Sequence, residues 1–216
     1  MTSSQGGAFN VRHTWFVGGS LVLASLVLGW NSPFPSPLFS VISALGTMLF
    51  AAALLVFAFG FRRAESVTAR RPLGTAVLTI LAVWILLSPL LTDVLLSGPI
   101  ENEPSSALLV HSLIDPYLRF ALALVAALQV GRTAVVPAPW NWAPAWALAV
   151  LTVPWVLGQV VTAGSSPESD PTLITYLAAF DALARSICTL VLGVVAILLA
   201  DRVRRSAGQP SNVVVG

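Results

Sequence analysis

The stretch LTILAVWILLSPLL, residues 78–91, carries no charged side chain, and it decides the fold class. It lies inside an apolar run over residues 73–97. Five further runs of this kind cover 14–30, 38–60, 106–131, 143–163 and 172–200. About 20 helical residues, each adding 1.5 Å, cross the hydrocarbon core of a bilayer. Because the runs lack the alternation of β-barrel strands, the sequence predicts an all-α polytopic membrane protein with six transmembrane helices.

The overall composition excludes a water-facing surface. Of the 216 residues, 56% are hydrophobic and only 9% are charged. A soluble domain has about 25% charged residues. The six runs leave no segment long enough for a separate soluble domain.

The distribution of arginine predicts the orientation in the membrane. All eleven basic residues are arginine, and nine of them lie outside the runs, before the first run, in the second and fourth connections, and after the sixth. The first, third and fifth connections hold none. By the positive-inside rule, both termini are expected in the cytoplasm, and the chain is expected in the cytoplasmic membrane.

The two ends of the chain are expected to differ from the membrane domain between them. We expect residues 1–13 to be a disordered cytoplasmic N-terminus, residues 14–201 to form the transmembrane domain, and residues 202–216 to be a basic and then disordered cytoplasmic tail. Past Trp30 the chain reads NSPFPSP, which offers no cleavage site of small residues. The first run is therefore interpreted as an uncleaved anchor rather than a signal peptide.

A pattern in the outer connections suggests an internal repeat. Each of them carries a pair of prolines and leads into an apolar run. Asp115 and Arg119 in the second unit match Asp181 and Arg185 in the third, 66 residues further on, whereas the first unit has no such pair. One interpretation is three parallel helical hairpins, over 14–60, 73–131 and 143–200. Chance similarity between proline-flanked apolar helices is the alternative.

These charged residues are the candidate functional site. An aspartate or arginine near the middle of a span costs about 2.5–3.5 kcal/mol on insertion scales. Residues four apart share a helix face, so Asp115 can pair with Arg119, and Asp181 with Arg185. His111 lies one turn before Asp115 on the same face. We expect the fourth and sixth helices to be adjacent, with both pairs in one polar cluster or facing a polar cavity.

The fourth run contains a helix break at Ser112 and Pro116. Pro116 has no amide hydrogen, so the carbonyl of Ser112 loses its helical partner, and Arg119 is placed to donate to that carbonyl. A rival interpretation makes Asp115 an N-cap and starts the helix at Pro116. That helix, 116–131, would be only about 24 Å long and too short to span, so one long, kinked helix is favoured.

Motifs for enzymatic chemistry are missing from the sequence. It contains no GxSxG, no HExxH, no phosphate-binding glycine loop and no dinucleotide fingerprint. The only cysteine, Cys188, excludes an intrachain disulfide, and the absence of lysine excludes a retinal Schiff base. We expect no cofactor, no metal site and no nucleic-acid partner, and the missing motifs weigh against an enzyme without excluding one.

Two classes of function remain. The first is a small transporter or channel-like protein, in which the Asp–Arg pairs handle a proton, a cation or a small polar solute. The second is a non-catalytic accessory or assembly subunit of a larger membrane complex. Transport requires an aspartate that reaches water or a substrate, whereas assembly is satisfied by saturated charges. The expected partners are the lipid bilayer, anionic lipids at the cytoplasmic arginines, and a second copy or a partner membrane subunit.

Overall fold

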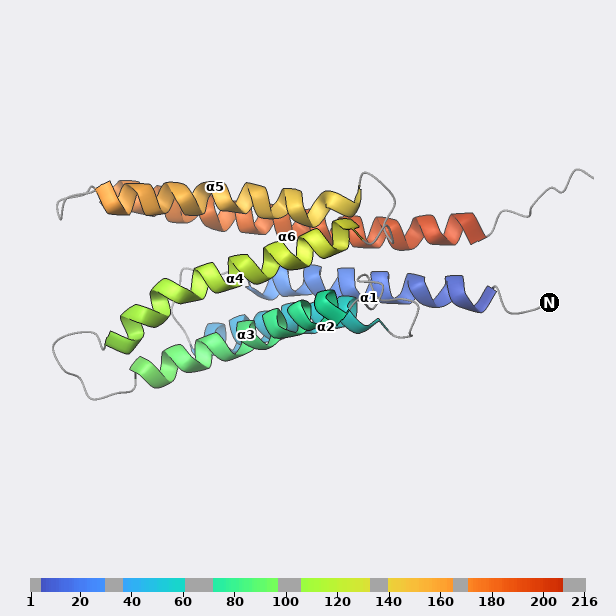
Figure 1. Cartoon of the computed structure of the whole chain (residues 1–216), viewed down its shortest axis with the longest axis horizontal. Coiled ribbons are helices and arrows are strands. Elements are labelled where there is room, and N and C mark those ends of the chain that lie inside the picture. Colours follow the sequence, from blue (N-terminus) through green and yellow to red (C-terminus); the bar gives the residue numbers. More distant parts are fainter. Residues whose placement is uncertain are drawn as a thin grey trace, which may run out of the picture.

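The computed structural model describes residues 5–29, 37–60, 72–96, 106–132, 140–164 and 171–207. Within these ranges the chain is helical and contains no strand, which confirms the all-α prediction (Figure 1). The helices are α1 (Gln5–Gly29), α2 (Pro37–Phe59), α3 (Pro72–Leu96), α4 (Ser106–Arg132), the short 3-10 helix η1 (Trp140–Trp142), α5 (Ala143–Gly164) and α6 (Pro171–Ala207).

Five of these helical segments are long and apolar enough to cross a membrane: those of α2, α3, α4, η1 with α5, and α6. The described apolar part of α1, His13–Gly29, is shorter. Large apolar side chains cover the outside of the bundle, and Val94, Leu113, Trp146 and Tyr176 are each more than half exposed. Soluble monomers rarely expose so much contiguous apolar surface. Both features fit an integral, multi-pass membrane protein.

The first and last helices extend beyond the predicted runs. α1 begins at Gln5 rather than at residue 14, and α6 continues to Ala207. The remainder of the two predicted tails, residues 1–4 and 208–216, lies outside the described residues.

The helices form a closed ring in chain order, because each packs against its neighbours in the sequence and α1 packs against α6. The contacts of α1 with α6 and with α2 are the most extensive, and those of α4 with α5 are the least. Figure 1 shows α4 running obliquely from α3 towards α5 and α6. The predicted adjacency of α4 and α6 is wrong, because α4 packs mainly on α3 and has no comparable interface with α6.

Glycines bring α1 and α6 close together. A Cβ on Gly19 would lie 3.0 Å from the carbonyl oxygen of Gly193 and from Ala196 Cβ. A Cβ on Gly193 would lie 2.6 Å from Leu23 Cδ2. Since hydrocarbon does not drive helices together as water does, close backbone approach through small residues is the usual basis of such packing.

The two ends of the bundle differ in charge and in packing. We call the end at which α1, α3 and α5 finish the acidic end (left in Figure 1), because the connections there carry Glu101, Glu103, Glu168 and Asp170 and no arginine. The opposite end is the arginine end. The main buried cluster, which includes Trp15, Val130 and Leu199, lies towards the arginine end. All buried residues of α4 fall in its last seven positions, so the half of α4 nearer the acidic end lies outside this core.

Candidate functional site

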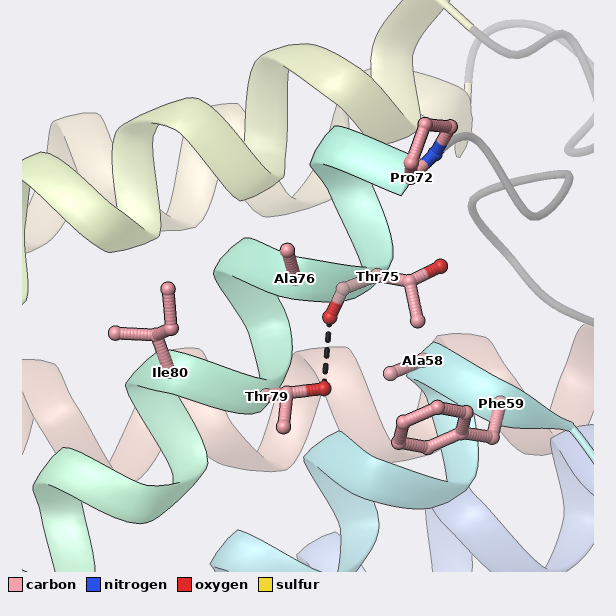
Figure 2. Close-up of a pocket in the computed structure, with 7 residues that line it drawn as sticks. All are labelled: Ala58, Phe59, Pro72, Thr75, Ala76, Thr79 and Ile80. Carbon is pink, nitrogen blue, oxygen red and sulfur yellow. Dashed lines mark hydrogen bonds between the residues drawn. The ribbon is translucent and has the colours of Figure 1, made fainter.

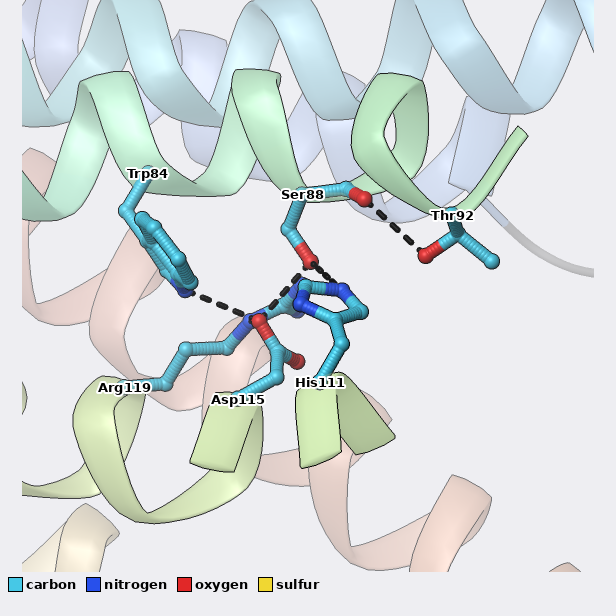
Figure 3. A network of polar contacts seen from close by, with 6 residues as sticks. All are labelled: Trp84, Ser88, Thr92, His111, Asp115 and Arg119. Carbon is cyan, nitrogen blue, oxygen red and sulfur yellow. Dashed lines mark hydrogen bonds and ion pairs between the residues drawn. The ribbon is translucent and has the colours of Figure 1, made fainter. Parts of the chain in front are cut away.

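Polar side chains of α3 and α4 meet in the half of the bundle nearer the acidic end. Trp84 and Ser88 come from α3, and His111, Asp115 and Arg119 come from α4; we call these five residues the α3–α4 polar cluster (Figure 3). Asp115 Oδ1 accepts hydrogen bonds from Trp84 Nε1 at 2.8 Å, from Ser88 Oγ at 2.8 Å and from Arg119 Nε at 3.0 Å. Arg119 Nε also lies 3.0 Å from Oδ2. The carboxylate therefore has three donors within its own chain.

Ser88 is at the centre of the cluster. Its side chain is buried, with 3% exposed, and its hydroxyl proton is donated to Asp115. Since a hydroxyl has one proton, the 3.4 Å contact between Ser88 Oγ and His111 Nε2 requires His111 to be the donor. The imidazole also lies beside the indole of Trp84, with ring centroids 6.2 Å apart. His111, Ser88 and Asp115 thus form a continuous chain of polar contacts.

The helix of the cluster runs through its proline. α4 is one helix of 27 residues with Pro116 inside it, so the rival interpretation of Asp115 as an N-cap is wrong. Ser112 Oγ donates to the carbonyl of Leu109 at 2.9 Å. Arg119 bonds Asp115, and a donation from Arg119 to the carbonyl of Ser112 stays a prediction.

The second charged pair lies apart from this cluster. Arg185 Nε is 2.7 Å from Asp181 Oδ2, within α6. The side chain of Arg185 is 63% exposed and that of Asp181 is 30% exposed, against 39% for Arg119 and 19% for Asp115. Among the described residues, no hydrogen bond or ion pair joins the two pairs. The prediction of a single four-charge cluster is therefore wrong, because α6 packs against α1 and α5 and has no comparable interface with α4.

Trp84 and Ser88 were not predicted from the sequence. A weak signal was present, because Ser88 directly precedes Pro89 in α3 as Asp115 precedes Pro116 in α4. Trp84 lies one turn before Ser88, so both side chains share a face of α3. In an apolar run, however, a tryptophan and a serine look like ordinary membrane-helix residues.

Two other features give less support for a functional site than the α3–α4 polar cluster does. An open groove lies between the end of α2 and the start of α3, lined by Ala58, Phe59, Thr75 and Thr79 among others (Figure 2). The hydroxyl of Thr79 donates its hydrogen to the carbonyl of Thr75 at 2.8 Å, so this hydroxyl has no hydrogen to donate to a ligand. Within the described part of the chain, no group of three histidine, cysteine or acidic side chains is placed to hold a metal ion.

Comparisons with known proteins add no family: no family model, no curated protein and no solved structure matches the chain. The fold thus defines a class, a multi-pass α-helical protein with a polar cluster between two apolar helices.

Proposed function

We propose that the chain crosses the cytoplasmic membrane six times, with both termini in the cytoplasm, and that it serves as a non-catalytic subunit of a larger membrane assembly. The orientation rests on the sequence pattern of nine arginines near the two termini and in the second and fourth connections, and none in the first, third and fifth. The six-span count also rests on this pattern, since an even number of spans returns the chain to its starting side. The same arginines are proposed to contact anionic lipid headgroups, each contributing about 1 kcal/mol.

The exposed Asp181–Arg185 pair carries the assembly proposal. A charged side chain in a span normally faces the bundle interior, a watery cavity or a partner. Arg185 is the more exposed partner of a pair that lies ten residues inside α6, and its side chain is 63% exposed within this chain. A neighbouring transmembrane helix that offers an acceptor to Arg185 and a donor to Asp181 would remove this cost. Asp115, by contrast, already has donors from α3 and α4 of its own chain.

The test is the mass of the assembly in a native membrane environment. The chain is extracted from its membrane directly into lipid nanodiscs, without detergent, and weighed by native mass spectrometry. We expect the wild-type chain to carry a partner and the double variant Asp181→Asn with Arg185→Gln to lose it. A mass that is a multiple of the chain identifies a second copy, and any other mass identifies a different subunit.

The matched control is Asp115→Asn with Arg119→Gln, which removes the same charges from the other pair and should keep the partner. A wild-type chain that is monomeric in these nanodiscs refutes the assembly proposal. So does a partner that survives the loss of Asp181 and Arg185.

Transport is the second candidate, and a specific observation favours it. His111, Ser88 and Asp115 form a chain of polar contacts next to Arg119, the type of arrangement that relays protons in membrane proteins. On this proposal Asp115 takes up a proton or a cation as Arg119 moves away. The double variant at Asp115 and Arg119 should then fold normally and yet be inactive in a flux assay on reconstituted vesicles. A stable and fully active double variant excludes transport through this cluster.

A further inference from the structure

The ring of helices encloses an apolar cavity of about 280 Å³ on the arginine-end side of the polar cluster. Every helix of the ring lines it. One representative lining residue from each helix, in chain order, is Trp15, Leu54, Leu81, Ala127, Leu148 and Leu192. The cavity is continuous with the faces that carry the polar cluster, since the lining residue Ala123 lies one turn beyond Arg119.

Small side chains leave this space open. α4 presents Ala123, Ala126 and Ala127 to the cavity, and the start of α5 presents Ala143 and Ala147. These two helices also form the least extensive interface of the ring, so neither backbone closes in to fill the gap. An unfilled space lined by apolar atoms forfeits dispersion contacts and does not hold water. In a bilayer the available filler is hydrocarbon.

A second cavity gives this space a polar mouth. It has a volume of about 230 Å³, and it shares Trp140, Val195 and Leu199 with the first cavity. Its remaining lining includes Asp201 and Arg202 at the arginine end of α6. An apolar interior that leads past a tryptophan to a guanidinium has the polarity profile of an amphiphile, with a hydrocarbon chain at one end and an anionic head at the other.

We propose that the bundle binds a single-chain anionic amphiphile, with its hydrocarbon chain in the central cavity and its headgroup at Arg202. The volume sets the number of chains, because 280 Å³ lies at the lower limit of about 300 Å³ for small-molecule pockets. The site accepts one chain and not the two of a bilayer phospholipid. It is independent of the assembly proposal, because Asp181 and Arg185 line neither cavity.

The experiment uses the full chain in nanodiscs and two photoactivatable probes with a diazirine in the chain. One is a lysophospholipid with an anionic phosphoglycerol headgroup, and the other is an uncharged monoacylglycerol of equal chain length. We expect the first probe to label residues that line the cavity, such as Ala127 and Leu192, in a saturable manner. A fatty acid that competes as well as an unlabelled lysophospholipid shows that any anionic head suffices, and competition by the lysophospholipid alone assigns a phosphate.

Two variants test the contribution of the hydrocarbon chain and that of the headgroup separately. Ala127→Leu fills the cavity and should weaken both probes at least about tenfold, since it removes space from a packed site. Arg202→Gln should weaken only the anionic probe, by about tenfold, as expected for the loss of one charge-assisted contact at an exposed position. Arg132→Gln is the matched control, because Arg132 is also exposed at the arginine end and lines neither cavity.

The proposal is overturned if labelling falls only on outward-facing residues such as Leu183. It is also overturned if Arg202→Gln and Arg132→Gln weaken the anionic probe equally. Because Arg202→Gln lies at the end of the bundle and does not alter the core, the test holds even if Ala127→Leu fails to fold.

Discussion

Arg119→Gln tests how strongly the α3–α4 polar cluster depends on its cation. Among the described residues, the Arg119 guanidinium is the only charged donor to Asp115, and its Nε lies 3.0 Å from both carboxylate oxygens. After the substitution, the carboxylate keeps Trp84 and Ser88, each a neutral donor at 2.8 Å. A formal negative charge then remains inside the bundle with no positive partner in the cluster.

The magnitude follows from the burial of the pair. Removing one partner of a buried ion pair costs about 3–5 kcal/mol in a protein interior. Here the side chain of Arg119 is 39% exposed and that of Asp115 is 19% exposed, so we expect about 2–3 kcal/mol after screening is taken into account. The double variant Asp115→Asn with Arg119→Gln should cost less than about 1 kcal/mol, since the asparagine oxygen keeps both neutral donors and no charge is left unpaired.

The assay is reversible unfolding in mixed micelles, with helicity followed as the denaturing detergent fraction is raised. The single variant should unfold at a clearly lower detergent fraction than the double variant, even though the double variant carries one more substitution. The reasoning is wrong if the double variant is the less stable of the two, because the cost would then lie in lost contacts and not in the unpaired charge.

Two further predictions concern topology and packing. Cysteines placed at Ser36, Ser105 and Ser166 should react with an impermeant reagent from the outside of intact cells, because their connections carry no arginine; labelling of any of them from the cytoplasmic side alone contradicts the orientation. Gly193→Ala should lower the stability of the bundle by about 1–3 kcal/mol, since its Cβ would lie 2.6 Å from a side-chain atom of α1. Gly158→Ala is the control and should leave the stability unchanged or raise it by up to about 1 kcal/mol in the same unfolding assay, because nothing lies within 4 Å of its added carbon and alanine favours a helix.

The limits of most helices could be predicted because local chemistry sets them. The observed starts of α2, α3, α4, α5 and α6 agree with the predicted runs to within one residue. Three of these helices begin at a proline, namely Pro37, Pro72 and Pro171, and proline suits the first helical turn because its missing amide hydrogen has no partner there anyway. Gly60 follows the end of α2 with a φ of 61°, and its amide donates a hydrogen bond to the carbonyl of Val56 at 2.8 Å. A glycine in this conformation is a common helix end.

The partners of the charged residues could not be predicted in the same way. A carboxylate inside an apolar helix needs hydrogen-bond donors, and the i, i+4 spacing correctly places Arg119 beside Asp115. It does not show that the other two donors are neutral side chains of α3, because Trp84 and Ser88 satisfy the carboxylate without leaving a charge pattern in the sequence. The prediction that Asp181 and Arg185 join the same cluster was wrong, because equal spacing within two helices does not show whether those helices face each other.

The sequence by itself therefore determined the fold class, the helix limits and the pairing of each aspartate with the arginine four residues on. These properties depend on the length of apolar runs and on contacts within one helix, and both can be read along the chain. Only the tertiary structure decided the order of the helices around the ring, the close approach at Gly19 and Gly193, the partners of Asp115 and the central cavity. Those features depend on which helices carry small side chains at the same depth in the bundle. Such packing is a property of a pair of helices, whereas hydropathy is a property of a single segment.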